Sequence, residues 1–472
     1  MRTNITHGTI VTPAGRYDAD LVVEDGVIAE VVRPGQAGLA DEELDASGRL
    51  VFPGFIDPHV HSREPGLTHK EDFAHSTRAA LCGGVTTLLE MPNTIPPVAE
   101  AAILRDRAAQ HAEVASVDFG LWGVSLGAAN VGEIDGLVAA GAPAIKLFWG
   151  YALDRRTREI VYSATDRPPE DVVPPPPNDE VFDLFRSVAG AGGLLAAHCE
   201  DRGVLEAAGR ALGHDSGTYA DLLASRPDAA EASAIAVAAE FARATGCRFH
   251  VVHVSSARGV EVLRRAQADG LPLTGETCPQ YLTLTDRDYE RIGPLMKIFP
   301  PVRTAADQEA LWAAVWDGTI TSLGSDHAPH TAEEKARGLA GAPAGAIGVE
   351  TIARLMLDAA ARGQLTYERL AWLLSEGTAR LYGLFPRKGA VRPGADADLA
   401  LVDPDAEWVI DDAHLHSLHP LSPWHGRRGR GAVTLALLRG SVAMREGEPV
   451  GEPRGRHVPS QRPHAGTKVG AR

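Results

Sequence analysis

Short apolar runs alternate with helix-forming stretches through the middle of the chain, and this alternation limits the fold more than any other feature. Eight runs have the length of buried strands, near residues 51–56, 85–89, 117–122, 144–148, 194–198, 249–253, 271–275 and 320–324. Stretches between them, such as 230–244, carry helical spacing. Eight strand–helix units predict an α/β fold, a (β/α)8 TIM barrel with insertions across residues 51–388. A doubly wound sheet is the alternative, but no G-x-G-x-x-G motif follows an early strand.

The two ends of the chain consist of short strand-like runs separated by Gly and Pro turns. Strand-like runs lie at 9–12, 20–23 and 27–32, and again at 398–402 and 433–438. We therefore expect residues 1–50 and 389–450 to form one small composite β-sandwich domain. Residues 451–472, rich in Gly, Pro, Arg and His, predict a flexible tail or an arm onto a partner subunit.

A proline-rich insertion, residues 166–177, follows the fourth strand of the predicted barrel. It contains six prolines, four of them consecutive. Proline runs form rigid, solvated spacers. However, loops that follow barrel strands lie on the active-site face. A lid over the site and a spacer therefore both fit the pattern.

Charge and cysteine usage limit the partners and the location. Lys and Arg number 46 against 62 Asp and Glu, a net charge of −16, which disfavours nucleic acid and anionic membranes as partners. The four cysteines form no C-x-x-C pair, as in proteins that keep reduced thiols. No apolar run reaches the length of a membrane span, and the first residues lack the apolar core of a signal peptide. We expect a cytoplasmic protein with a small-molecule substrate.

Ionisable residues gather at the ends of the predicted barrel strands, where side chains converge on one site. They are Asp57, His59 and His61 closing the first strand, Lys146 in the fourth, His198 and His253 ending the fifth and sixth, and Asp326 after the eighth. His59 and His61 are two residues apart, so a strand points both toward the barrel axis as half of a metal site. Lys146 lies in an apolar run, where an unpaired ammonium is costly. Together these residues predict metal binding.

The motifs around these residues resemble the two signatures of dihydroorotases. These signatures are GFIDPHVHSREPG at residues 54–66 and GSDHAPHTAEEK at residues 324–335. Dihydroorotases belong to the amidohydrolase superfamily, with allantoinases, hydantoinases and dihydropyrimidinases as relatives. The resemblance extends over nearly the whole chain, including EMPN at 90–93, HCED at 198–201 and HVSS at 253–256.

The resemblance implies a site with two divalent metal ions, zinc first, with manganese or cobalt fitting the same ligands. The implied ligands are His59, His61, Lys146, His198, His253 and Asp326. By the same resemblance, CO2 carboxylates Lys146 so that it bridges the metals, and Asp326 transfers the proton when water opens a cyclic amide. A homodimer or homotetramer is expected by analogy alone.

The residues that would recognise the ring indicate different substrates. Arg63, Asn93 and His330 match the positions that hold the carboxylate of dihydroorotate, and they favour dihydroorotase-type hydrolysis. Tyr151, five residues past Lys146, matches a hydantoinase tyrosine that binds the substrate carbonyl. Phe299 stands where dihydroorotases place an Asn.

We rank dihydroorotase-type hydrolysis of a carboxylated ring first, and allantoinase or hydantoinase/dihydropyrimidinase activity second. Another carboxylated cyclic amide is a further possibility. A non-catalytic scaffold homologue is disfavoured, because all six ligand positions are retained.

Overall fold

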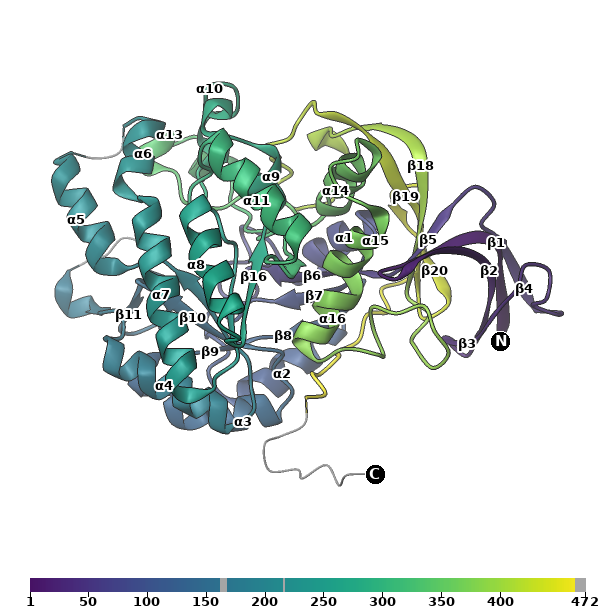
Figure 1. Cartoon of the computed structure of the whole chain (residues 1–472), viewed down its shortest axis with the longest axis horizontal. Coiled ribbons are helices and arrows are strands. Elements are labelled where there is room, and N and C mark those ends of the chain that lie inside the picture. Colours follow the sequence, from purple (N-terminus) through teal and green to yellow (C-terminus); the bar gives the residue numbers. More distant parts are fainter. Residues whose placement is uncertain (162–167, 215–216, 463–472) are drawn as a thin grey trace.

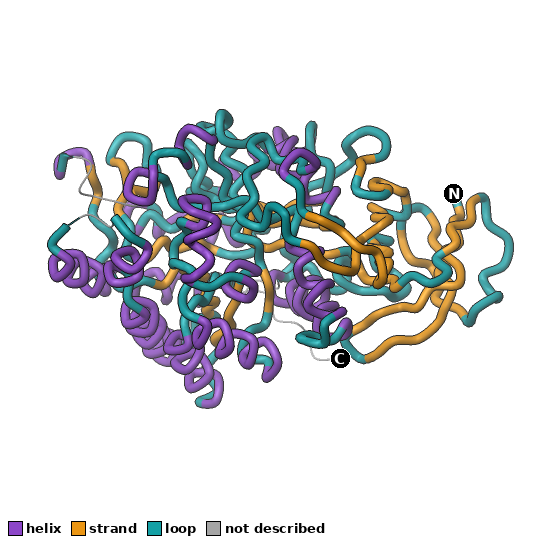
Figure 2. The backbone as a smooth tube through the Cα atoms, turned by 90° about the horizontal axis from the view of Figure 1, so that it is seen from above, coloured by secondary structure: helices purple, strands orange, loops and turns teal. Residues whose placement is uncertain are grey.

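The chain folds into a helix-covered barrel beside a sheet built from both of its ends (Figure 1). The computed structural model describes residues 1–161, 168–214 and 217–462. Seen from above, the helices surround the barrel, and the sheet extends to its side (Figure 2). Among the described residues, no helix is both long and apolar enough to cross a bilayer.

The barrel is a ring of parallel strands. They are β6 (Phe55–Val60), β7 (Val85–Glu90), β8 (Asp118–Leu121), β9 (Gly123–Val124), β10 (Ile145–Trp149), β14 (Leu195–Cys199), β15 (Phe249–Val251), β16 (Leu273–Thr277) and β17 (Ser322–Leu323). Pairing runs β6-β7-β8 and β9-β10-β14-β15-β16-β17. The chain itself joins β8 to β9, and a bridge between Val60 and His327 closes the ring. The predicted TIM barrel is confirmed.

Helices cover the outside of the barrel, and all of the longer ones except α5 have buried residues. The longer ones are α1 (Phe73–Cys82), α2 (Ala101–Ala112), α4 (Asn178–Gly190), α5 (Arg202–Leu212), α7 (Asp228–Thr245), α8 (Ala257–Ala268), α11 (Ala305–Asp317) and α14 (Ile352–Ala361). In α4, the buried residues are Val181, Leu184, Phe185 and Val188, the spacing of one helical face. Side-chain caps fix several starts, such as Ser256, which accepts a hydrogen bond from the Gly259 amide at the start of α8.

Shorter helices fill the connections on the rim of the barrel and near the sheet. They are α3 (Ile134–Ala139), α6 (Tyr219–Ser225), α9 (Pro279–Thr283), α10 (Tyr289–Ile292), α12 (Ala332–Lys335), α13 (Gly338–Gly341), α15 (Tyr367–Ala371) and α16 (Gly377–Tyr382). Of these, α12 immediately follows the loop that carries Asp326 and His330. The loops of this rim position most of the candidate substrate-binding residues.

Strands from both ends of the chain form the second unit. They are β1 (Arg2–Thr12), β2 (Gly15–Glu24), β3 (Val27–Val32), β4 (Glu42–Asp45), β5 (Leu50–Pro53), β18 (Leu399–Val409), β19 (Arg428–Leu438), β20 (Ser441–Arg445) and β21 (Glu448–Pro449). The order is β21-β20-β19-β18-β5-β1-β2-β3, with β4 beside β1. A separate apolar core that includes Ile10, Leu21, Val51 and Leu399 lies within it. The composite β domain predicted from the two ends is therefore present.

The sequence run predicted as one barrel strand at residues 51–56 serves both units. It divides at Gly54, between β5 in the sheet and β6 in the barrel. A Cβ atom at Gly54 would lie 2.1 Å from Thr86 Oγ1, and the Gly54 amide donates to the Asp398 carbonyl over 2.7 Å. Only glycine permits this close crossing from sheet to barrel.

A buried ion cluster ties the two units together. Lys388 Nζ lies 2.5 Å from carboxylate oxygens of Asp118 in β8 and Asp398 beside β18, and 2.9 Å from Asp396. The Lys388 side chain is only 1% exposed. The three carboxylates hold the pKa of the Lys388 ammonium above its usual range in spite of burial. This cluster fixes the base of the barrel to the sheet.

Two irregular segments also contact the barrel. Residues 455–458 lie along β8, where the Phe119 amide donates to the Arg456 carbonyl over 3.0 Å and the Val458 amide to the Phe119 carbonyl over 2.7 Å.

The described part of the proline-rich insertion contains β13 (Val172–Val173), which pairs with β11 (Ala152–Asp154). β11 also pairs with β12 (Ile160–Val161). Asp166 and Arg167 lie outside the described residues. A lid role for the insertion stays a prediction.

Candidate metal centre and active site

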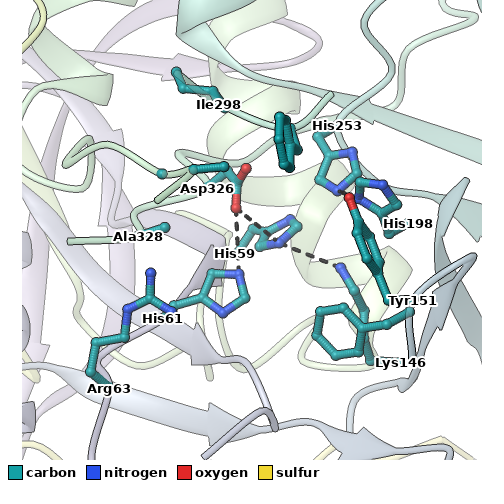
Figure 3. A pocket seen from close by; sticks show the side chains of 14 residues that line it. His59, His61, Arg63, Lys146, Tyr151, His198, His253, Ile298, Asp326 and Ala328 are labelled. Carbon is teal, nitrogen blue, oxygen red and sulfur yellow. Dashed lines mark hydrogen bonds and ion pairs between the residues drawn. The ribbon is translucent and has the colours of Figure 1, made fainter. Parts of the chain in front are cut away.

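The ligand-type side chains predicted from the sequence meet in one pocket at the C-terminal ends of the barrel strands (Figure 3). Its lining residues are His59, His61, Arg63, Lys146, Phe148, Tyr151, His198, His253, Ile298, Phe299, Asp326, Ala328, Ala344 and Gly345. All six predicted metal ligands are therefore brought together.

His59, His61 and Asp326 form the first half of the centre. The Nε2 atoms of His59 and His61 each lie 3.4 Å from Asp326 Oδ1. The outer nitrogen of each ring is held from behind: His59 Nδ1 lies 2.8 Å from Glu276 Oε1, and His61 Nδ1 lies 2.7 Å from Asn93 Oδ1. Acceptors behind each ring fix the tautomer that presents Nε2 to a metal.

His198, His253 and Lys146 form the second half. His198 Nδ1 faces His253 Nε2 across 3.1 Å, and His198 Nε2 lies 2.7 Å from Glu200 Oε2. Lys146 Nζ lies 3.5 Å from His59 Nε2, so it stands between the two halves of the centre (Figure 3).

The donor set fits divalent metal ions. Burial lowers the pKa values of the His59 and His253 imidazoles well below their ordinary range, so both rings are neutral, the form that binds metal. Glu200 accepts from the Nε2–H of His198, so the lone pair of His198 Nδ1 faces His253 Nε2 across 3.1 Å. A cation between such nitrogens satisfies both, and imidazole with carboxylate is a donor set that zinc accepts.

Unusual backbone geometry sets the direction of the site residues. Arg63, His253 and Asp326 have positive φ angles of 63°, 40° and 50°, which are rare for residues other than glycine and cluster at functional sites. Asp57 supports this geometry, because its Oδ1 accepts from the backbone amides of His59 at 3.1 Å and Ser325 at 3.0 Å. Asp57 is thus a connector between the first and last strands.

Burial also perturbs the charges at the centre. It lowers the pKa of the Lys146 ammonium, an effect partly opposed by Asp326 and Glu276. It raises the pKa of Glu276, against the attraction of Lys146. Perturbed groups of this kind are typical of functional sites.

The four predicted substrate-binding residues take different positions. Arg63 and Tyr151 line the pocket, whereas Asn93 and His330 are absent from its described lining. Arg63 Nη2 lies 3.3 Å from His330 Nε2, so these two residues are neighbours. Asn93 lies behind His61, as a support for a metal ligand.

Several site residues were not singled out from the sequence. Glu276 lies one residue before the end of β16 and contacts His59, and Glu200 lies two residues past His198 and contacts it. Arg226, in the connection before α7, donates to Glu200. The rule that ionisable residues end barrel strands identifies Glu276 when it is applied to the seventh strand. No local sequence signal marks Arg226.

Comparison with known proteins decides the family. The model of the Amidohydrolase family matches residues 50–442. The chain belongs to the amidohydrolase family. This amidohydrolase is 39% identical to an allantoinase of Rubrobacter xylanophilus, over 97% of this chain and 98% of the relative. It is 34% identical to an L-hydantoinase of Paenarthrobacter aurescens, over 93% of each chain.

Solved structures agree with this assignment. The structure of L-hydantoinase (dihydropyrimidinase) from Arthrobacter aurescens superposes with a TM-score of 0.90 at 33% identity, covering 97% of this chain and 99% of that one. A dihydropyrimidinase of Brevibacillus agri gives 0.86 at 26% identity, over 98% and 100% of the two chains. The amidohydrolase is therefore a hydrolase of cyclic amides. Dihydroorotase-type specificity, which the sequence ranked first, is not supported, and the allantoinase or hydantoinase alternative fits better.

Proposed function

We propose that this amidohydrolase opens the five-membered ring of allantoin by hydrolysis of its ring amide. The observation that carries the proposal is where Arg63, Asn93 and His330 lie, the three residues expected to bind a substrate carboxylate. Of the three, Arg63 alone lines the pocket, while Asn93 Oδ1 and both ring nitrogens of His330 contact other protein groups. The three-point carboxylate grip of the dihydroorotase match is therefore incomplete in the pocket, and the Arg63 guanidinium can donate to the carbonyl of a ureido substituent instead.

The hydrogen bonds of Asn93 and His330 support this reasoning. Asn93 Oδ1 accepts from the Nδ1–H of His61. His330 Nε2 lies 3.0 Å from the Ala344 carbonyl and His330 Nδ1 lies 3.3 Å from Glu334 Oε2, so both ring nitrogens face acceptors within the protein. Burial lowers the pKa of His330 to about 3, and the neutral ring has no second N–H to offer a substrate.

The pocket wall favours a ureide or hydantoin ring over dihydroorotate. Phe299 lines it at the position where a dihydroorotase-like site would place an amide donor. Tyr151 also lines it and presents a hydroxyl near the His198 and His253 rings (Figure 3). A hydroxyl in this position can donate to the oxygen of the amide that is cleaved.

The chemistry divides between the metals and the side chains. Metal ions held by the six ligands would lower the pKa of water and polarise the ring carbonyl. Asp326, in contact with both His59 and His61, would accept the proton of the attacking water and deliver it to the ring nitrogen as the C–N bond breaks. One water is added, and the product carries a carboxylate and a new N–H.

Lys146 is proposed to act as a carbamate. Its side chain is 1% exposed, and its nearest polar neighbour is the ring nitrogen of His59. Attack of the neutral amine on CO2 forms an N–C bond, releases a proton and yields an anion that can hold two cations. Carboxylation thus replaces a costly buried cation by a metal ligand.

A hydantoin with an apolar 5-substituent is the second candidate. Phe148, Ile298 and Ala328 contribute apolar surface to the pocket, and such a surface accepts an apolar substituent. This substrate lacks the ureido group that Arg63 would contact, which is why allantoin is placed first.

A ring-opening panel tests the proposal. Purified protein containing its metals is assayed with allantoin, 5-substituted hydantoins, dihydrouracil and dihydroorotate, and kcat/KM is compared. We expect allantoin to give the highest value and dihydroorotate the lowest. Dihydroorotate as the best substrate would contradict the proposal, and preference for a 5-alkyl hydantoin would select the second candidate.

A further inference from the structure

Arg226 is a buried cation directly behind the pocket wall. Its side chain is 10% exposed, and its Nη1 donates to the Tyr151 hydroxyl over 3.1 Å and to Glu200. The guanidinium lies 3.5 Å from the centre of the Phe299 ring, a cation–π stack. It therefore contacts two residues that line the pocket and a carboxylate that supports His198.

The backbone around Arg226 and Tyr151 holds the two side chains in contact. Arg303 Nη1 donates to the Arg226 carbonyl over 2.9 Å, which fixes the connection between α6 and α7. Gly150 has a φ of 93°, and a Cβ there would lie 2.4 Å from the Glu200 carbonyl. Only glycine allows β10 to end so close to Glu200 and turn Tyr151 toward Arg226.

The hydrogen-bond directions follow from the chemistry of the groups. A guanidinium only donates, so the Tyr151 oxygen must accept from Arg226, and its own proton must go elsewhere. That proton has a long contact of 3.4 Å with Glu200 Oε2. Glu200 Oε2 already accepts hydrogen bonds from Arg226 and His198. The hydroxyl proton of Tyr151 can therefore turn from this long contact to an acceptor in the pocket.

We infer that Arg226 is a positioning residue that holds the Tyr151 hydroxyl as a hydrogen-bond donor to the carbonyl oxygen of the scissile ring amide. It does so by occupying the acceptor side of the hydroxyl and by fixing Phe299 as the wall beside it. Arg226 itself does not line the pocket in the described structure. This inference rests on the proposed function, which places Tyr151 at the substrate carbonyl.

A double-mutant cycle tests the coupling. The variants are Tyr151→Phe, Arg226→Gln and the combination, assayed with the best substrate of the panel. Loss of the hydroxyl should lower kcat by about 100-fold or more, and loss of its positioning should lower kcat by about 10- to 100-fold. In the Tyr151→Phe background, Arg226→Gln should change kcat less than about threefold, because the hydroxyl that Arg226 positions is absent.

Controls separate positioning from general damage. Arg226→Lys keeps the charge beside Glu200 but loses the planar fork, so it should recover part of the lost kcat and covers the case in which Arg226→Gln does not fold. Arg202→Met, which removes an exposed arginine paired with Glu206, should behave as the wild type. Bound metal per chain should stay unchanged in every variant.

Two results would overturn the inference. One is that the fold-loss of kcat in the double variant equals the product of the losses in Tyr151→Phe and in the Arg226 variant. The other is that metal content falls in step with kcat, which would assign Arg226 to the support of His198. If Tyr151→Phe alone leaves kcat unchanged, the placement of Tyr151 in the proposed function fails, and the inference fails with it.

Discussion

Replacing Arg63 by Met removes the guanidinium that lines the pocket but leaves the metal ligands in place. The side chain is 8% exposed, and its Nε donates to the Pro329 carbonyl over 3.3 Å. The remaining N–H groups are therefore the ones that can meet a substituent on the ring. In the proposed reaction they donate to the ureido carbonyl of allantoin.

The size of the effect follows from that one contact. A hydrogen bond from a charged donor is worth about 1.5–3 kcal/mol, and about 1.4 kcal/mol corresponds to a factor of ten. Arg63→Met should therefore lower kcat/KM for allantoin by about 10- to 150-fold. Unsubstituted hydantoin carries the same ring without the ureido group, so its kcat/KM should change less than about threefold.

The assay compares the two substrates on the same protein preparations. Arg78→Met, which removes an exposed arginine on α1, is the control for loss of one positive charge. The ratio of the two kcat/KM values cancels errors in the active fraction of each preparation. An equal fall for allantoin and hydantoin would refute the reasoning, since Arg63 would then support the loop at Pro329 rather than contact the ureido group.

Two further predictions concern the metal centre and the joint between the two units. Lys146→Met should reduce bound divalent metal from two ions to at most one per chain, measured by elemental analysis of protein purified without chelator; two retained ions would contradict a bridging role. Lys388→Met should destabilise the fold by about 3–5 kcal/mol, because Asp118 and Asp396 keep an arginine partner but the buried Asp398 carboxylate loses its cation. The loss is measured as a lower urea midpoint of unfolding. Arg392→Met, which changes an exposed site in the same connection, is the control. Equal midpoints for the two variants would show that the cluster contributes nothing to stability.

Individual residues mark what could be predicted at the site and what could not. The spacing of His59 and His61 on one strand, and the positions of Lys146, His198 and Asp326 near strand ends, were enough to place them together, because a closed barrel leaves such residues no other location. Asn93 shows the limit. Its motif indicated a substrate contact, but its side chain lies behind His61, and only the packing of β6 against β7 determines which of these positions it takes.

The sequence by itself determined the barrel and the composite β domain and predicted which residues would bind metal, since strand and helix periodicity and strand-end chemistry are local properties. The tertiary structure decided the rest. It divided one apolar run between two sheets at Gly54, brought Glu276 behind His59 across 217 residues of sequence, and placed Arg226 against Tyr151. Contacts between residues so distant in the chain depend on how the elements pack, and no local pattern records them. The proposed preference for allantoin rests on such contacts, together with the similarity to allantoinases and hydantoinases.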